Sequence, residues 1–173
     1  MKKFVIAILL GLFGLTAQAQ DVFNVVRAND VEALKVLITN KTDLNTVNER
    51  GFTPFIIATY NGNIEVAELL IDNGADINAV DKSGNNALMG AIFKGDFNMM
   101  KFLIEKGINV NHINFNGANA LIFATTFGKV DVVKLLLDAK IDTSVKDNRG
   151  LTALDYAKSQ ENTEVIQLLE GIQ

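Results

Sequence analysis

Residues 51–83 decide the fold, and they read GFTPFIIATYNGNIEVAELLIDNGADINAVDKS. Thr53-Pro54 opens a first short helix, because threonine caps helix N-termini and proline fits the first helical turn. The sequence predicts that this helix ends near Tyr60 and that a second helix runs from Ile64 to Asp72. Asn73-Gly74 ends the second helix, since glycine readily takes the left-handed conformation. An extended, turn-rich loop is expected to follow.

The same pattern recurs every 33 residues. Gly51, Gly84, Gly117 and Gly150 mark the period, and an alanine follows each glycine by seven residues. The two helices of a unit are too short to be stable alone, so stacked units must bury their apolar faces in one continuous core. The period predicts an all-α solenoid of five helix-turn-helix repeats with protruding loops. The expected repeats span about residues 20–48, 49–81, 82–114, 115–147 and 148–173.

The motifs within each unit closely resemble the ankyrin repeat. That family has a 33-residue period, a Thr-Pro-Leu-His opening and a Gly-Ala-Asp-x-Asn close. Here the opening reads Thr53-Pro54-Phe55-Ile56, and the close reads Gly74-Ala75-Asp76-Ile77-Asn78. The resemblance covers the whole chain from about residue 20 onward. The family histidine is absent from every opening, and we expect apolar packing by Ile56, Met89 and Ile122 to replace its hydrogen bond.

The first and last units carry polar residues at positions that are apolar elsewhere. Asn24 is one such residue in the first unit, and Asp155 and Glu170 are two in the last. Terminal repeats of solenoids expose one face to water, so these units are predicted to be caps, with the domain ending at Gln173.

The first 19 residues have the layout of a secretory signal peptide. Lys2 and Lys3 precede an uncharged run from Phe4 to Leu15, and Ala17-Gln18-Ala19 gives a small-x-small cleavage pattern. The run is too short for a transmembrane helix. We expect cleavage before Gln20 and a bacterial protein that is periplasmic or extracellular, with no membrane attachment after cleavage.

Composition excludes several kinds of site. The net charge of −4 argues against nucleic acid as the main ligand. The chain has no cysteine and one histidine, which excludes thiolate chemistry and sites built from several imidazoles. No pairing of a nucleophile with a base is evident, so the sequence predicts a protein that is not an enzyme and needs no cofactor.

Rows of Asp and Asn recur in the loops, and His112 lies among them. Stacked oxygens could bind Ca²⁺, so a small-molecule or calcium-binding module is an alternative function. The favoured interpretation is structural, because Asp and Asn satisfy backbone N–H groups in turns. These rows comprise Asp43, Asp76, Asn109 and Asp142; Asn45, Asn78, Asn111 and Ser144; and Asn48, Asp81, Asn114 and Asp147.

The resemblance also implies a function. Ankyrin proteins meet protein partners with their loop tips and with the exposed side of the first helices. Exposed apolar patches, aromatics and arginine favour binding there. We therefore expect a monomeric, exported, non-enzymatic scaffold for a protein partner. Catalase-associated defence against oxidants is a further alternative that rests on resemblance alone. The partner-binding residues expected from the repeat positions are Arg50, Phe52, Tyr60, Lys82, Phe93, Lys94, Phe115, Phe127 and Arg149.

Overall fold

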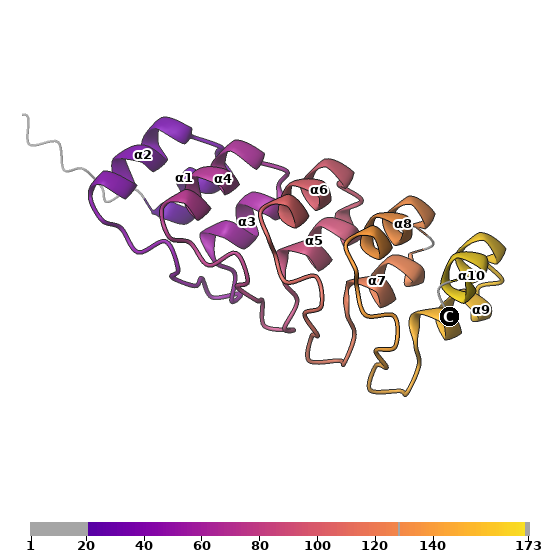
Figure 1. Ribbon diagram of the computed structural model, residues 1–173. Coiled ribbons are helices and arrows are strands. Elements are labelled where there is room, and N and C mark those ends of the chain that lie inside the picture. Colours follow the sequence, from indigo (N-terminus) through magenta and orange to yellow (C-terminus); the bar gives the residue numbers. More distant parts are fainter. Residues whose placement is uncertain (1–20, 128, 172–173) are drawn as a thin grey trace, which may run out of the picture.

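The computed structural model describes residues 21–127 and 129–171, which form five consecutive helix pairs (Figure 1). The predicted signal peptide lies outside the described residues. Within them the only β-type pairing is an isolated bridge between Val80 and Asn86. The first helices of the pairs, called the inner helices, are α1 (Val22–Arg27), α3 (Pro54–Tyr60), α5 (Ala87–Lys94), α7 (Ala120–Thr126) and α9 (Ala153–Ser159). The second helices, called the outer helices, are α2 (Val31–Thr39), α4 (Ile64–Asp72), α6 (Phe97–Glu105), α8 (Val130–Asp138) and α10 (Thr163–Glu170).

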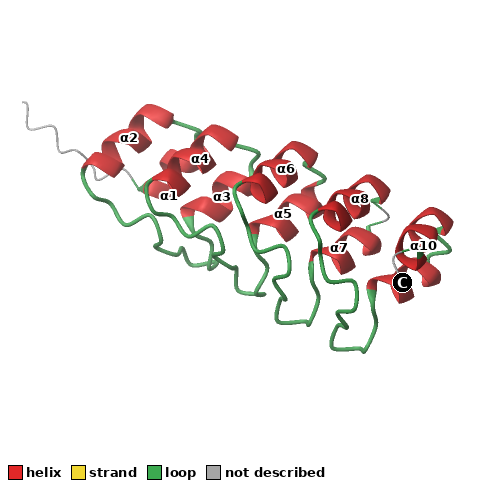
Figure 2. Cartoon of the chain, viewed as in Figure 1, coloured by secondary structure: helices red, strands yellow, loops and turns green. Residues whose placement is uncertain are grey.

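The helices stack as two layers, and long loops project beyond them on one side (Figure 2). The prediction of an all-α solenoid is confirmed. The predicted ends of α3 and α4 are also confirmed, because each follows from local chemistry. The Thr53 hydroxyl accepts a hydrogen bond from the backbone N–H of Ile56 at 3.2 Å, and Pro54 occupies the first turn. Gly74 follows α4 with a φ of +94°.

Small residues allow the inner helices to pack closely. Each inner helix contacts the next one along the chain. At the recurring alanine position, Ala58 and Ala124 are fully buried, and Ala91 and Ala157 are nearly so. One continuous core of buried residues therefore runs from α1 to α10. The inner helices make closer contact than the outer helices, so the inner layer faces the concave side of the stack.

Asparagine links two of the openings to the following repeat. Ile56, Met89 and Ile122 are buried, as expected. In addition, Asn119 caps α7 by accepting from the Ile122 N–H at 3.1 Å, and its Nδ2 donates to the Asp142 carbonyl at 2.8 Å. Asn86 makes the same pair of bonds one repeat earlier. In these two repeats the opening is therefore bonded to the following repeat as well as packed by apolar side chains.

A second set of asparagines ties each loop to the next repeat. Asn45 Oδ1 accepts from the backbone N–H of Asp76 at 2.8 Å, and Asn45 Nδ2 donates to the Gly74 carbonyl at 3.0 Å. The acceptor bond recurs from Asn78 to Asn109 at 2.8 Å and from Asn111 to Asp142 at 2.7 Å. We call these bonds the asparagine ladder. They confirm the structural interpretation of these loop residues.

The third row of Asp and Asn closes the loop tips. Asp147 Oδ1, for example, accepts from the backbone N–H groups of Arg149 and Leu151 at 2.9 and 3.1 Å. Asn48, Asp81 and Asn114 make the equivalent bonds in the other loops. These side chains therefore hold the tips in one shape in every repeat.

The residues expected to cap the stack are exposed. In the last repeat Asp155 forms a capping box with Thr152, which lowers the pKa of the Asp155 carboxyl because the Thr152 N–H and hydroxyl both donate to it. Glu170 pairs with Lys158 at 3.0 Å. In the first repeat Asn24 is exposed and accepts from Arg27. The polar substitutions thus face water, as solenoid caps require.

Candidate binding groove

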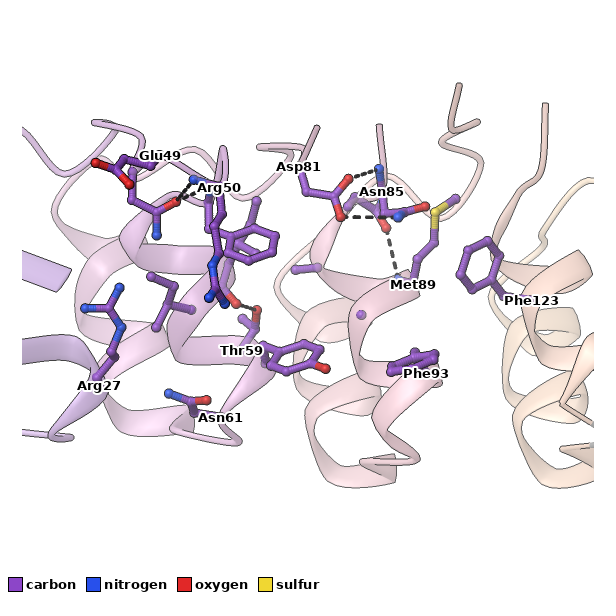
Figure 3. A pocket seen from close by; sticks show the side chains of 18 of the residues that line it. Arg27, Glu49, Arg50, Thr59, Asn61, Asp81, Asn85, Met89, Phe93 and Phe123 are labelled. Carbon is purple, nitrogen blue, oxygen red and sulfur yellow. Dashed lines mark hydrogen bonds between the residues drawn. The ribbon is translucent and has the colours of Figure 1, made fainter. Parts of the chain in front are cut away.

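A groove of about 1070 Å³ runs along the inner helices beneath the loop tips (Figure 3). Its lining comes from α1, α3, α5 and α7 and from the loop tips before α3 and α5. The residues that line it are Arg27, Asn48, Glu49, Arg50, Phe52, Ile56, Ile57, Thr59, Tyr60, Asn61, Asp81, Asn85, Asn86, Ala87, Met89, Gly90, Phe93, Phe123 and Phe127.

Exposed aromatic rings gather in this groove. Phe93 and Phe127, from neighbouring repeats, pack edge to face with ring centroids 5.7 Å apart, and Phe123 lies 6.3 Å from Phe127. Phe93 is nevertheless 58% exposed, and Tyr60 and Phe127 are each 43% exposed. Lys94 places its ammonium 4.9 Å from the centroid of the Tyr60 ring. Four residues predicted from the sequence to bind a partner, Tyr60, Phe93, Lys94 and Phe127, thus lie together in the structure.

Comparison with known proteins gives the family. Residues 22–114 match a model described as ankyrin repeats in three copies, and residues 103–157 match one described as ankyrin repeats in many copies. The chain belongs to the ankyrin repeat family. Ankyrin repeats in general are protein–protein interaction modules. No curated protein matches this sequence.

Three of the expected partner-binding residues depart from the single exposed row that the repeats implied. Phe52 lines the groove, but it is only partly exposed because its ring packs against the core. Phe115 is 71% exposed yet does not line the groove. It lies at a loop tip, where its N–H donates to the Ser83 carbonyl and its ring lies against Gly84. Lys82 also lies outside the lining and donates to the Glu49 carbonyl.

The two predicted arginines lie at opposite ends of the aromatic cluster. Arg50 is exposed at the loop tip before α3 and lines the groove. Arg149 lines a smaller cavity of about 370 Å³, which shares Phe123 and Phe127 with the groove. Its guanidinium lies 5.2 Å from the Tyr156 ring centroid and donates to Asp147 at 3.2 Å. Arg149 is therefore held by its own repeat.

Asp147 is the buried anion beneath Arg149. The Tyr156 hydroxyl donates to Asp147 Oδ2 at 2.5 Å. Burial opposes ionisation of this carboxyl, but the backbone N–H groups of Leu151 and Arg149 and the Arg149 guanidinium outweigh it. The pKa of Asp147 is consequently held below its ordinary value. Its charge thus fixes the positions of the Tyr156 ring and Arg149 at this end of the surface.

Several lining residues could not be found from exposure patterns in the sequence. Phe123 occupies a position that reads as core, because its equivalent Ile57 is buried. In the structure Phe123 is partly exposed and lines both cavities. The buried Met89 and the partly exposed Gly90 also line the groove floor. Only their positions on the inner helix could have indicated them from the sequence. Gly90 is equivalent to Ile57 and Phe123, and Met89 is the residue before it.

The lone histidine is engaged by the scaffold. His112 is partly buried, and its Nε2 donates to the Gly84 carbonyl at 2.6 Å. Among residues 21–127 and 129–171 no group of three or more His, Asp or Glu side chains is placed to hold a metal ion. Likewise, no helix in this part of the chain combines the length and apolar character needed to cross a membrane.

Proposed function

We propose that this ankyrin repeat protein is a non-enzymatic scaffold whose groove holds a segment of a protein partner. The observation that carries the proposal is the cluster of exposed rings of Tyr60, Phe93 and Phe127 in a groove of about 1070 Å³. Exposed apolar surface tends to mark interaction sites. Buried aromatics are also the side chains that most often contribute about 2 kcal/mol or more to an interface.

The scaffold presents these rings on a preformed surface. The inner helices that carry them share one continuous core, and the asparagine ladder links their loops from repeat to repeat. A surface that is already ordered loses little conformational entropy on binding. The partner therefore meets rings whose positions are set before contact. Arg50, Lys82, Lys94 and Arg149 would mainly affect the rate and orientation of association.

The test is affinity capture from an extract of the native organism, with a matched pair of variants. Phe93→Ala/Phe127→Ala removes two rings from the groove, whereas Phe115→Ala removes a more exposed ring outside it. Circular dichroism first establishes that both variants are folded. We expect a partner that binds wild type and Phe115→Ala but not the double variant. Equal capture by all three proteins would contradict the groove, and loss only with Phe115→Ala would move the site to the loop tips.

We also propose that the chain is exported and that residues 1–19 are removed. The support is the Lys2-Lys3 start, the uncharged run that follows and the Ala17-Gln18-Ala19 pattern. Fractionation of expressing cells, followed by N-terminal sequencing, tests this directly. We expect the protein outside the cytoplasm with Gln20 at its N-terminus. A cytoplasmic protein that begins with Met1 or Lys2 would contradict export without affecting the groove.

A further inference from the structure

Gly90 is a glycine that the fold does not require. It lies inside α5, and its φ is outside the left-handed region, so other residues can adopt its backbone conformation. A Cβ added there would meet only Tyr60 Cδ2 at 3.8 Å, which is an ordinary van der Waals contact. Alanine would fit and would favour the helix, because only proline is a poorer helix former than glycine. A glycine at this position therefore keeps space open.

The open space lies in the floor of the groove. The equivalent positions in neighbouring repeats carry large side chains, Ile57 and Phe123, and both line the same groove as Gly90. The missing side chain leaves a gap between them. Phe93 borders this gap, since it lies three residues after Gly90 on the same helix face, and Tyr60 borders it from α3. We call the gap the Gly90 notch.

Charge divides the two faces of the stack. The outer helices carry nine carboxylates and three lysines, a net charge of −6, whereas the inner helices carry three cations and one carboxylate, a net charge of +2. The outer face pairs lysines with carboxylates, as Lys134 does with Glu164 at 2.9 Å. In an acidic chain, the layer that bears the groove is thus the positive one.

Two of these cations share a cavity with Tyr60, the ring that borders the notch. Arg27 and Lys94 are the last residues of α1 and α5, and together with Tyr60 and Asn61 they line a polar cavity of about 580 Å³ that adjoins the groove. Lys94 lies over the same Tyr60 ring that borders the notch. Among the described residues, neither cation forms an ion pair with a carboxylate.

Two of the three carboxylates that line these surfaces are already engaged. Asp96 lines the polar cavity, but its Oδ1 accepts from the Met99 N–H and caps α6. Asp81 lines the groove, and its two oxygens accept from Ser83 and Asn85 in the loop tip. The third, Glu49, lines the groove at the loop tip before α3, where the cation Arg50 follows it in the chain and lines the groove as well. The polar cavity that holds Arg27 and Lys94 therefore keeps its positive character.

We propose that the bound partner segment is acidic, with one large apolar side chain in the Gly90 notch and an adjacent Asp or Glu against Arg27 and Lys94. This inference rests on the proposed function and adds the chemistry of the partner. The notch supplies the apolar anchor, and the cations supply charge-assisted hydrogen bonds, which are stronger than neutral ones.

The test is selection of random 12-residue peptides, displayed on phage, on the purified wild-type protein. Binding of the selected peptides is then measured by fluorescence anisotropy. Gly90→Leu fills the notch, and Gly90→Ala is a milder variant that leaves the fold intact. Arg27→Gln/Lys94→Gln removes the two charges. Lys101→Gln is the matched control, because Lys101 lies on the outer helix α6 at 5.0 Å from the Phe97 ring, much as Lys94 lies over Tyr60.

We expect the selected peptides to carry Asp or Glu within a few residues of a Leu, Met, Phe or Trp. Gly90→Leu should weaken their binding by about tenfold or more, because its side chain takes the space of the apolar anchor, and a lost methylene contact in an apolar pocket corresponds to a change of about 10–200-fold. The double glutamine variant should weaken it by about tenfold and reduce its salt dependence. Lys101→Gln should change nothing.

Three results would overturn the inference. They are peptides without an excess of acidic residues, peptides that bind Gly90→Leu as well as wild type, and no enrichment of any peptide. Each leaves the proposed function open to its own test, since capture of a partner that depends on Phe93 and Phe127 would still locate binding in the groove. If such a partner is captured but the peptide selection fails, the groove binds a folded surface of the partner rather than an acidic segment.

Discussion

Replacing Asn119 should separate two contributions to the stability of the stack. Its side chain is 1% exposed, and it makes a helix cap at 3.1 Å and a bond to the next repeat at 2.8 Å. Loss of a cap costs about 1 kcal/mol. Loss of a typical hydrogen bond costs about another 1 kcal/mol. Asn119→Ala should therefore lower the free energy of unfolding by about 2 kcal/mol.

Asn119→Thr is the informative partner of this variant. Threonine caps α3 and α9 at the equivalent position through its hydroxyl, but the Thr53 and Thr152 side chains make no bond to the following repeat. The threonine variant should keep the cap and lose only the bond to Asp142, a cost of about 1 kcal/mol. Asn86→Thr repeats the test one repeat earlier, where the bond is made to the Asn109 carbonyl.

Urea and thermal unfolding followed by circular dichroism measure both effects. For a chain of this length, 1 kcal/mol corresponds to a shift in Tm of about 2–4 °C, so the expected losses are about 4–8 °C for alanine and about 2–4 °C for threonine. A threonine variant as stable as wild type would show that the bond between repeats contributes nothing. A threonine variant as unstable as the alanine variant would refute the separation of the two roles.

Four further predictions follow from particular residues. Gly90→Ala should raise the free energy of unfolding by about 0.5–1 kcal/mol, because the new methyl fits and the helix gains, and urea unfolding checks it. Lys140→Gly should stabilise by about 0.5 kcal/mol by relieving a non-glycine φ of +61°, and an unchanged unfolding midpoint would contradict this. Gly84→Ala should cost about 2–4 kcal/mol, since its Cβ would lie 2.8 Å from the Phe115 nitrogen at a φ of +76°, whereas Gly107→Ala, with open space around it, should cost about 1 kcal/mol. The pKa of Asp147 is lowered in the folded protein, so its charge stabilises the fold above the ordinary carboxyl pKa, and this stabilisation is lost as the pH falls through the pKa of the folded state. Asp147→Asn should therefore make the free energy of unfolding fall less steeply on acidification below about pH 4, as measured by urea unfolding.

The repeat structure was predictable from the sequence because its causes are local. A capping threonine, a proline in the first turn and a glycine after the second helix set the ends of α3 and α4 without reference to the rest of the chain. The buried alanines followed from the period. Thr53 and Gly74 behave as their chemistry requires, and repetition every 33 residues extended the inference to each unit.

The site was predictable only in part, because exposure depends on neighbours that a period does not describe. Phe123 is partly exposed because the equivalent residue in the preceding repeat is Gly90, which has no side chain to cover the Phe123 ring. Phe115 leaves the groove because its backbone pairs with Ser83. His112 is held because its ring reaches Gly84, 28 residues earlier. The expected monomer, the absence of a nucleic-acid partner and the role in oxidant defence stay predictions. Light scattering on the purified protein tests the first of these.

The asparagine ladder has a consequence for how such a chain can change in length. Each bond joins one repeat to its neighbour through the same two kinds of atom at 2.7–2.8 Å, whichever pair of repeats is involved. If an internal repeat were duplicated in the gene, the repeat and its copy could form the same hydrogen bond from asparagine to a backbone N–H that already joins the existing repeats. Insertion of a second copy of residues 84–116 would therefore lengthen the stack by one unit without a new interface having to be invented. Growth by whole repeats would then add a second notch like that at Gly90, one 33-residue step along the groove.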